Sequence, residues 1–179
     1  MSQVWEKEST AYFQCLVYIK SYKKYKDGGV VLKMSIRNEI IMDFSSNSEN
    51  ESLARTVISA FVARLDPTLE ELADIKTAVS EAVTNAIIHG YEKQPGMVRM
   101  KAVIQENVLS IEISDQGAGI ENLKRAMEPM YTSKPELDRS GMGFAFMEAF
   151  MDELEVESEV GKGTVIRMKK RIYSAIHIS

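Results

Sequence analysis

The sequence predicts a two-layer α/β sandwich, built from a mixed, mostly antiparallel sheet with helices on one face. Four segments with the alternating apolar pattern of strands form two hairpins. Two long segments with the spacing of amphipathic helices precede these hairpins. Because several strands follow one another directly, a parallel sheet with strictly alternating strands and helices is disfavoured.

Composition indicates one soluble domain with an appendage. The 179 residues are 45% hydrophobic and 27% charged, which is enough for a sizeable core. One cysteine excludes an internal disulfide and suits a reducing cytoplasm, and two histidines leave no zinc-type cluster. A net charge of −4 disfavours a nucleic-acid surface, and no apolar run reaches the roughly 20 residues of a membrane span.

Residues 1–33 differ from the rest of the chain. They contain the only tryptophan and cysteine, and six lysines against three acidic residues. One interpretation is a basic, aromatic arm for a membrane surface or an acidic partner. The favoured one is an N-terminal extension outside the working protein, with translation starting at Met34, which mass spectrometry of the native N-terminus would test. We therefore expect the domain at 34–171 and a tail at 172–179.

The first strand and helix follow this segment. Residues 36–44 alternate as a half-buried strand. Ser46, Asn47 or Ser48 is expected to cap a helix that runs to about Leu65 and ends before Pro67. The residues expected on its core side are Leu53, Val57, Phe61 and Leu65.

The second helix is predicted over residues 69–90. Thr68 and Glu71 form a capping-box pattern at its start, and Gly90 is the expected stop. Its predicted core face consists of Ile75, Val79, Ala82, Val83, Ala86 and Ile87. Glu81 and Asn85 lie four residues apart and therefore project from one side of the helix.

The remainder reads as two hairpins around a loop. Residues 97–105 and 108–114 pair across Glu106-Asn107, where asparagine is expected to accommodate the turn. A short helix at 121–127 and a polar loop at 129–140 follow. Gly143 then opens a helix with Phe144, Met147 and Met151 on one stripe, and residues 154–158 and 164–170 form the last hairpin.

Three groups of residues could support chemistry. A carboxylate and an amide at the spacing of Glu81 and Asn85 can accept a proton and hold a hard cation, although such a pair usually forms a solvated face. Asp115, at a strand end beside glycines, can accept a hydrogen bond from an exocyclic amine such as that of adenine. Gly141 and Gly143 precede a helix, whose free N–H groups attract phosphate. Each signal alone is weak, and neither glycine pair matches a P-loop or a dinucleotide fingerprint.

In combination these motifs resemble the GHKL (Bergerat-fold) ATP-binding domain that histidine kinases and gyrase share. The resemblance covers about residues 36–170. Within it, the segments SEAVTNAIIHGY and TSKPELDRSGMGF are similar to those of bacterial anti-sigma factor kinases. The sporulation group, which inhibits a sigma F-type factor, is the better match, and the sigma B stress-response group is the alternative.

The resemblance implies a role for each matching residue. Glu81 would be the catalytic base that activates a serine hydroxyl on an anti-anti-sigma protein, and Asn85 would ligate Mg²⁺. Asp115 would recognise the adenine amino group. The other expected ATP-binding residues are Gly117, Gly119, Arg139, Ser140, Gly141, Gly143 and Thr164, with residues 129–140 as the ATP lid. His89 lies beside the predicted helix stop and is interpreted as a helix-end residue rather than a phosphoacceptor.

The resemblance also implies partners. A sigma factor, an anti-anti-sigma substrate and a second copy of the chain are expected, and the first strand is a candidate edge for the homodimer. Glu51 and Arg55 match positions that meet protein partners, but a solvated ion pair explains this spacing equally well.

Two other functions remain open beside the kinase. A non-catalytic module could use ATP only to clamp a sigma factor, although Glu81 favours catalysis. The catalytic half of a histidine kinase is disfavoured, since the chain has no room for a dimerisation helix pair with a phosphoacceptor histidine.

Overall fold

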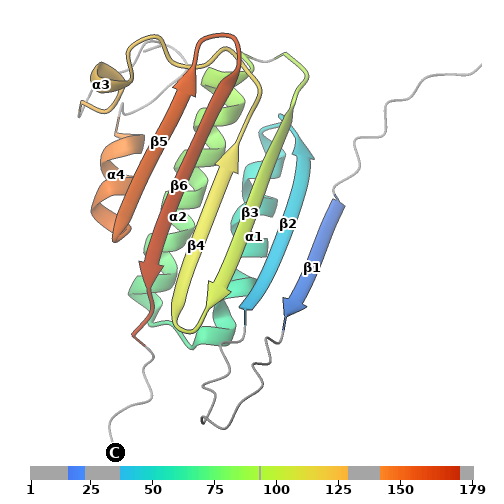
Figure 1. The fold of residues 1–179 in the computed structure, drawn as a ribbon, viewed down its shortest axis with the longest axis vertical. Helices are drawn as coiled ribbons and strands as arrows, with labels where there is room; N and C mark the ends of the chain where they lie inside the picture. The colour runs from blue at the N-terminus through green and yellow to red at the C-terminus, as the bar shows by residue number, and fades with distance from the viewer. Residues whose placement is uncertain (1–15, 23–36, 93, 129–141, 174–179) are drawn as a thin grey trace, which may run out of the picture.

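The protein, described here from a computed structural model, is a six-stranded sheet with helices on one face (Figure 1). The structure describes residues 16–22, 37–92, 94–128 and 142–173. The strand order is β1-β2-β3-β4-β6-β5 and every pairing is antiparallel. The strands are β1 (Leu16–Tyr22), β2 (Arg37–Ser45), β3 (Met97–Gln105), β4 (Val108–Ser114), β5 (Glu153–Glu159) and β6 (Gly163–Arg171).

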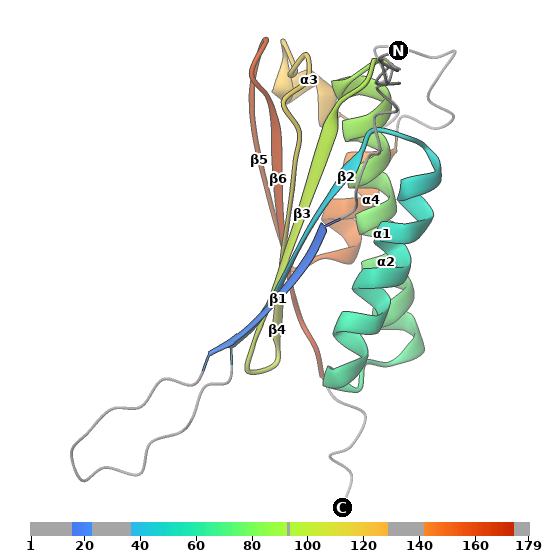
Figure 2. The same cartoon turned by 90° about the vertical axis from the view of Figure 1, so that its right-hand side faces the viewer.

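The long helices α1 and α2 and the shorter α4 form the second layer, on the same side of the sheet (Figure 2). The predicted sandwich, with a mostly antiparallel sheet, is therefore confirmed. The helical segments are α1 (Glu49–Val62), the 3₁₀ turn η1 (Ala63–Leu65), α2 (Leu69–Asn85), the π-helical turn η2 (Ala86–Gly90), α3 (Leu123–Ala126) and α4 (Gly143–Phe150).

The core lies between the two layers. Alternate residues of the sheet point toward the helices, so that Met42, Met100 and Ile111 are at most 2% exposed. All six apolar residues predicted for the core face of the second helix are buried there. This apolar stripe fixes the rotation of α2 about its axis, and thereby fixes which side Glu81 and Asn85 occupy.

Two local predictions need correction. Of the four residues predicted for the core side of the first helix, Phe61 is buried and Val57 and Leu65 pack partly buried against the core, but Leu53 is 39% exposed. The buried residues of α1 are Ala54, Ile58, Phe61 and Val62. They follow one another at steps of three or four residues or lie side by side, so they share one face of the helix, and Leu53 falls beside that face. In the turn between β3 and β4, Glu106 rather than Asn107 adopts the positive φ, at 56°.

The capping box at the start of α2 is confirmed. The Thr68 hydroxyl accepts the Glu71 N–H at 3.1 Å, and the Glu71 carboxylate accepts the Thr68 N–H at 2.8 Å. A second oxygen of Glu71 accepts the Tyr173 N–H beyond β6. The box therefore anchors the helix of Glu81 both locally and to the end of the sheet.

Replacing Thr68 with alanine should lower the free energy of unfolding by about 1 kcal/mol, because one N–H at the helix start loses its acceptor. Chemical denaturation measures this change. Thr56→Ala is the matched control: its hydroxyl only donates back to the Ser52 carbonyl within α1, so its stability should change by less than about 0.5 kcal/mol. Equal effects of the two substitutions would contradict the capping role.

β1 adds a strand that the sequence pattern did not predict. Leu16–Tyr22 pairs antiparallel with β2 along seven register positions, from Leu16 opposite Asp43 to Tyr22 opposite Arg37. The prediction that the first strand of the domain provides an exposed edge is therefore wrong for β2. The backbone groups on this side of β2 already have a partner within the same chain.

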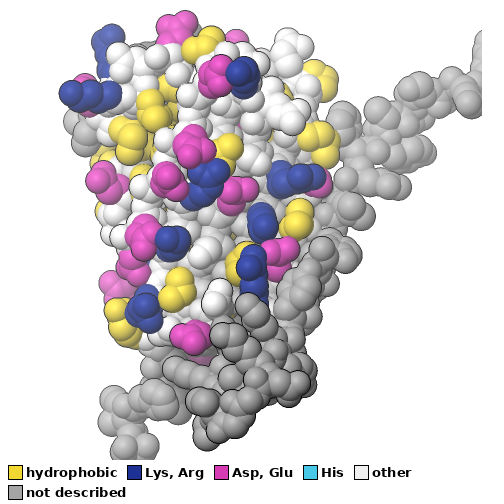
Figure 3. All heavy atoms as spheres, in the orientation of Figure 1, with side chains coloured by type: hydrophobic (Ala, Val, Ile, Leu, Met, Phe, Trp, Pro, Cys, Tyr) yellow, Lys and Arg dark blue, Asp and Glu magenta, His cyan; other side chains and the backbone are white. Residues whose placement is uncertain are grey.

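The other face of the sheet lacks a helical layer in the described part of the chain and is covered by charged side chains of both signs (Figure 3). Arg99 pairs with Asp43 at 2.6 Å, and Arg167 contacts Glu112 and Glu157 at 2.9 and 3.0 Å. Exposed pairs of this kind contribute little to stability but keep the face polar. Among the described residues, no helix is long and apolar enough to cross a membrane.

Candidate nucleotide-binding site

The helix α2 continues into a π-helical turn directly after Asn85. The Tyr91 N–H donates to the Ala86 carbonyl at 3.2 Å, five residues back. Such turns often occur at functional sites because they alter where backbone groups point. Here the Gly90 carbonyl accepts the Ala118 N–H at 2.7 Å. The end of η2 is thereby fixed to the glycine-rich segment after β4.

Glu81 and Asn85 lie beside the first residue of α4. A Cβ placed on Gly143 would sit 3.0 Å from the Glu81 Oε2 and 3.4 Å from the Asn85 Nδ2. The glycine therefore lets the backbone at the start of α4 approach both side chains closely. A carboxylate, an amide and the N-terminus of a helix meet here, and this combination suits an anionic ligand and a hard cation.

Asp115 forms a second cluster beyond the end of β4. It is only 7% exposed, and a Cβ on Gly90 would lie 2.8 Å from its Oδ1. Burial raises the pKa of Asp115 above its ordinary value, while hydrogen bonds from the N–H groups of Gly117 and Thr164 oppose that rise. A carboxylate has about four acceptor sites, so beside these two N–H groups Asp115 can also accept a hydrogen bond from a donor on a ligand.

The segment after Asp115 has a fixed acceptor for nearly every backbone N–H. Those of Gln116, Gly117 and Ala118 donate in turn to the Tyr91 hydroxyl, the Asp115 Oδ1 and the Gly90 carbonyl, at 2.9, 2.9 and 2.7 Å. Gly119 follows with a φ of 72°, and a Cβ there would lie 2.2 Å from a backbone oxygen of β5. This segment is therefore tightly held against η2 and the end of β5.

Thr164 completes this cluster from β6. It is 9% exposed, and its carbonyl accepts the Asp115 N–H at 3.0 Å. Its hydroxyl lies 2.9 Å from that of Ser158, which also accepts the Ile120 N–H at 2.9 Å. Ser158 therefore joins Thr164 to the end of the glycine-rich segment.

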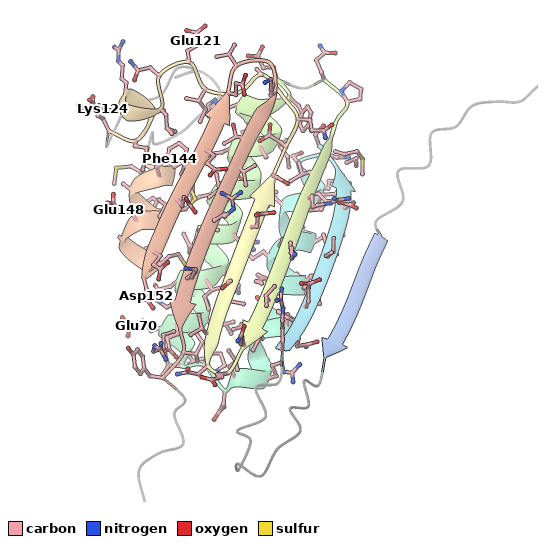
Figure 4. All side chains as sticks on the ribbon, viewed as in Figure 1. Glu70, Glu121, Lys124, Phe144, Glu148 and Asp152 are labelled. Atoms are coloured by element: carbon pink, nitrogen blue, oxygen red, sulfur yellow. The ribbon has the colours of Figure 1, made fainter. Side chains whose placement is uncertain are left out.

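The two clusters share the same end of the sandwich. From Asn85 to Gly90 the chain advances five residues, a rise of about 7 Å for helical geometry. Figure 4 shows Phe144 near the start of α4, with Glu121 and Lys124 at the α3 end of the molecule. An elongated ligand could contact Asp115 with one end and the Asn85 region with the other.

The side-chain oxygens of Glu81 and Asn85 suit a cation whose remaining ligands are phosphate oxygens of a bound nucleotide. Within the described ranges, no group of three or more His, Cys, Asp or Glu side chains could hold a metal ion. The oxygens of Glu81 and Asn85 are hard donors near a helix N-terminus. Mg²⁺ commonly takes one or two protein oxygens and completes its shell with phosphates and water.

Several predicted site residues lie outside the described residues. These are Arg139, Ser140 and Gly141, together with the predicted lid at 129–140. Gly143, the second glycine of that motif, does lie at the start of α4 beside Glu81 and Asn85. His89 lies in the last turn of the π-helical segment, where the helix-end interpretation places it.

Glu51 and Arg55 lie on α1 and form an ion pair at 3.6 Å. Glu51 also accepts a hydrogen bond from the Ser80 hydroxyl on α2, so it is tied to the residue that precedes Glu81. Arg55, Lys76 and Ser80 line an open groove of about 700 Å³ between the two helices. The groove is polar and basic along this stretch.

Sequence reasoning missed three features of the site: the π-helical turn, Tyr91 and Ser158. The turn has no local sequence signature. Tyr91 and Gln116 are 25 residues apart and Ser158 and Ile120 are 38 apart, so their contacts depend on the tertiary fold. The one available signal was a tyrosine directly after the glycine that ends the helix.

Comparison with known proteins adds a family to this geometry. A model of the histidine kinase-like ATPase domain matches residues 44–170. The anti-sigma F factor of Clostridium acetobutylicum is 59% identical over 136 residues, which cover 76% of this chain and 95% of the relative. The anti-sigma F factors of a Thermoanaerobacter species and of Geobacillus thermodenitrificans are 57% and 56% identical, covering 79% and 76% of this chain and 99% and 94% of theirs.

The matched region contains both site clusters and the whole of α2, so the similarity extends over the residues that form the site. The chain therefore belongs to the anti-sigma F factor family, within the histidine kinase-like ATPase domain family.

Proposed function

We propose that the protein is an anti-sigma factor of the sigma F type and an ATP-dependent protein-serine kinase. In this proposal it inhibits a sporulation sigma factor and phosphorylates a serine of an anti-anti-sigma protein. The observation that supports it most is the meeting of Glu81, Asn85 and the start of α4, together with the buried carboxylate of Asp115 beside Gly90. The ATPase family match and the names of the relatives support the same function.

ATP would bind along the end of α2. Asp115 would accept the adenine amino group, with Gly117, Gly119 and Thr164 around the base. The N–H groups at the start of α4 would face the phosphates, and Arg139, Ser140 and Gly141 are proposed to join them there. Asn85 would hold Mg²⁺, which neutralises phosphate charge when bound.

Glu81 would act as the general base. Its carboxylate lies beside the start of α4, where the γ-phosphate is proposed to sit. Such a group need only reach the incoming serine hydroxyl by a hydrogen bond and accept its proton as the bond to phosphorus forms. The products would be ADP and a phosphoserine on the partner.

Partner binding is proposed for the outer side of α1. Arg55 keeps 43% of its side chain exposed beside the groove, while Glu51 is linked through Ser80 to the helix of Glu81. A partner that contacts Arg55 would therefore lie beside Glu51, whose carboxylate accepts a hydrogen bond from Ser80, the residue before Glu81. The domain is proposed to span residues 34–171, and self-association into a homodimer is part of the proposal.

Arg55→Glu should weaken the complex with a sigma F-type factor at least tenfold, because it replaces the cation offered to the partner with a second anion beside Glu51. The dissociation constant is measured by binding of the purified protein, in the presence of ATP, to the immobilised sigma factor. Arg64→Glu, an exposed cation just beyond α1, is the matched control and should change it less than about twofold. An unchanged constant in the Arg55 variant would contradict this surface.

The switch itself can be tested by affinity capture from sporulating cells. We expect the tagged protein to retain a sigma factor in the presence of ATP and an anti-anti-sigma protein in the presence of ADP. Recovery of the sigma factor regardless of nucleotide would favour a binding module without a switch. Recovery of neither class would contradict the proposed function.

A further inference from the structure

We propose that Tyr91 is a positioning residue for base recognition, which holds the segment after Asp115 in the geometry that reads the adenine amino group. The inference rests on the proposed function, since it assumes that Asp115 meets the base. Tyr91 acts on Asp115 through the backbone of Gln116, whose N–H donates to the Tyr91 hydroxyl.

The hydroxyl of Tyr91 uses both of its hydrogen-bonding capacities. It donates to the Met97 carbonyl at the start of β3, at 2.6 Å, and accepts the Gln116 N–H at 2.9 Å. A phenol has one proton to donate, and the two bonds together set the direction in which the hydroxyl accepts. The hydroxyl is therefore a fixed bridge from β3 to the residue directly after Asp115.

The ring of Tyr91 is fixed as well. A Cβ on Gly96 would lie 2.1 Å from the ring, so the glycine provides the space that the ring occupies. The Tyr91 N–H is bound to Ala86 in the π-helical turn, and its carbonyl accepts the Gln94 N–H at 2.7 Å. Side chain and backbone are thus both held, and the hydroxyl has little freedom to move.

Consecutive N–H groups explain why this bridge would affect Asp115. The Gln116 N–H goes to Tyr91, and the next N–H, that of Gly117, goes to the Asp115 carboxylate itself. If Gln116 shifts, the bond between Gly117 and Asp115 must adjust with it. The carboxylate would then lose the orientation that an exocyclic amine requires.

The test compares ATP with purine riboside 5′-triphosphate, which lacks the amino group, by calorimetric binding to the full chain. Wild type should prefer ATP, and Tyr91→Phe should reduce that preference about fivefold, the effect of one hydrogen bond. Binding of the analogue should change less than about twofold. Tyr173→Phe, which removes a hydroxyl from a residue 71% exposed, is the matched control and should leave both constants unchanged.

A double-mutant cycle separates positioning from general support of the fold. In an Asp115→Asn background, Tyr91→Phe should have no further effect on the preference, because its target is already absent. Equal weakening of both nucleotides by Tyr91→Phe would show a merely structural role and overturn the inference. If wild type does not prefer ATP over the analogue, both the proposed base recognition by Asp115 and the inference about Tyr91 fail. If wild type discriminates and Tyr91→Phe retains the full preference, only the inference about Tyr91 fails.

Discussion

Glu81→Ala should retain ATP binding and lose phosphoryl transfer by a factor of about 10² to 10⁴, the usual contribution of a general base. The side chain lies beside the start of α4, but Asn85, Asp115 and the helix N-terminus remain when it is removed. Binding energy for the nucleotide is therefore preserved while the proton of the incoming serine has no acceptor. Single-turnover transfer to the partner and equilibrium binding of ATP measure the two quantities separately.

Two further variants sharpen this prediction. Glu81→Gln keeps the shape of the side chain beside Gly143 but removes its basicity, so it should lose transfer as fully as the alanine variant. Glu70→Ala, an exposed carboxylate in the first turn of the same helix (Figure 4), should transfer phosphate at the wild-type rate. If both Glu81 variants lose ATP binding in proportion to transfer, Glu81 is a ligand residue and the assignment as base is wrong.

Asp115→Asn should weaken ATP binding about 10- to 100-fold, the effect of losing a hydrogen bond to a charged acceptor. An amide has only one acceptor oxygen. Its NH₂ group would therefore face another donor and lose a hydrogen bond, either at the N–H groups of Gly117 and Thr164 or at the adenine amine. Purine riboside triphosphate should be weakened far less. Similar losses for both nucleotides would contradict recognition of the amino group.

The same variant should fold as well as the wild type at neutral pH. Burial raises the pKa of Asp115, so the folded state favours the protonated acid more than the unfolded state does. The stability associated with this group is therefore complete below its unfolded pKa and is lost as the pH rises through its folded pKa. Asparagine does not ionise, so the stability of Asp115→Asn does not fall in this pH range for this reason.

Unfolding experiments can test that sign directly. The stability of Asp115→Asn relative to wild type should be greater at pH 7 than at about pH 4, because the raised pKa of Asp115 makes the folded wild type gain stability as its carboxyl is protonated in acid. Chemical denaturation at both pH values measures the difference. A relative stability that instead increases toward acid pH would show that the hydrogen bonds from Gly117 and Thr164 outweigh burial.

The fold was predictable where local signals were strong. The capping box and the apolar spacing of α2 lie within one segment, and both are confirmed. One position on the core face of α1 was mispredicted, because Ala54 gives a weaker apolar signal than Leu53, although of the two only the alanine is fully buried. β1 was missed because its place in the sheet depends on pairing with β2 across residues 23–36.

The candidate site was predictable as a set of motifs but not as an arrangement. The spacing of Glu81 and Asn85 indicated one helix face, and the glycines after Asp115 indicated a close backbone approach. That Gly143 would lie against both side chains, and that Tyr91 would hold Gln116, depends on contacts between distant segments. No local pattern encodes such contacts, since each requires the sheet to be assembled first.

The most direct test of the account is to find where the γ-phosphate of ATP goes. The full chain is incubated with γ-labelled ATP, Mg²⁺ and a purified anti-anti-sigma protein, and the phosphorylated residue is mapped by mass spectrometry. The account predicts stoichiometric label on one serine of the partner, absent with Glu81→Gln. Label on a histidine of this chain, or release only as inorganic phosphate, would contradict it.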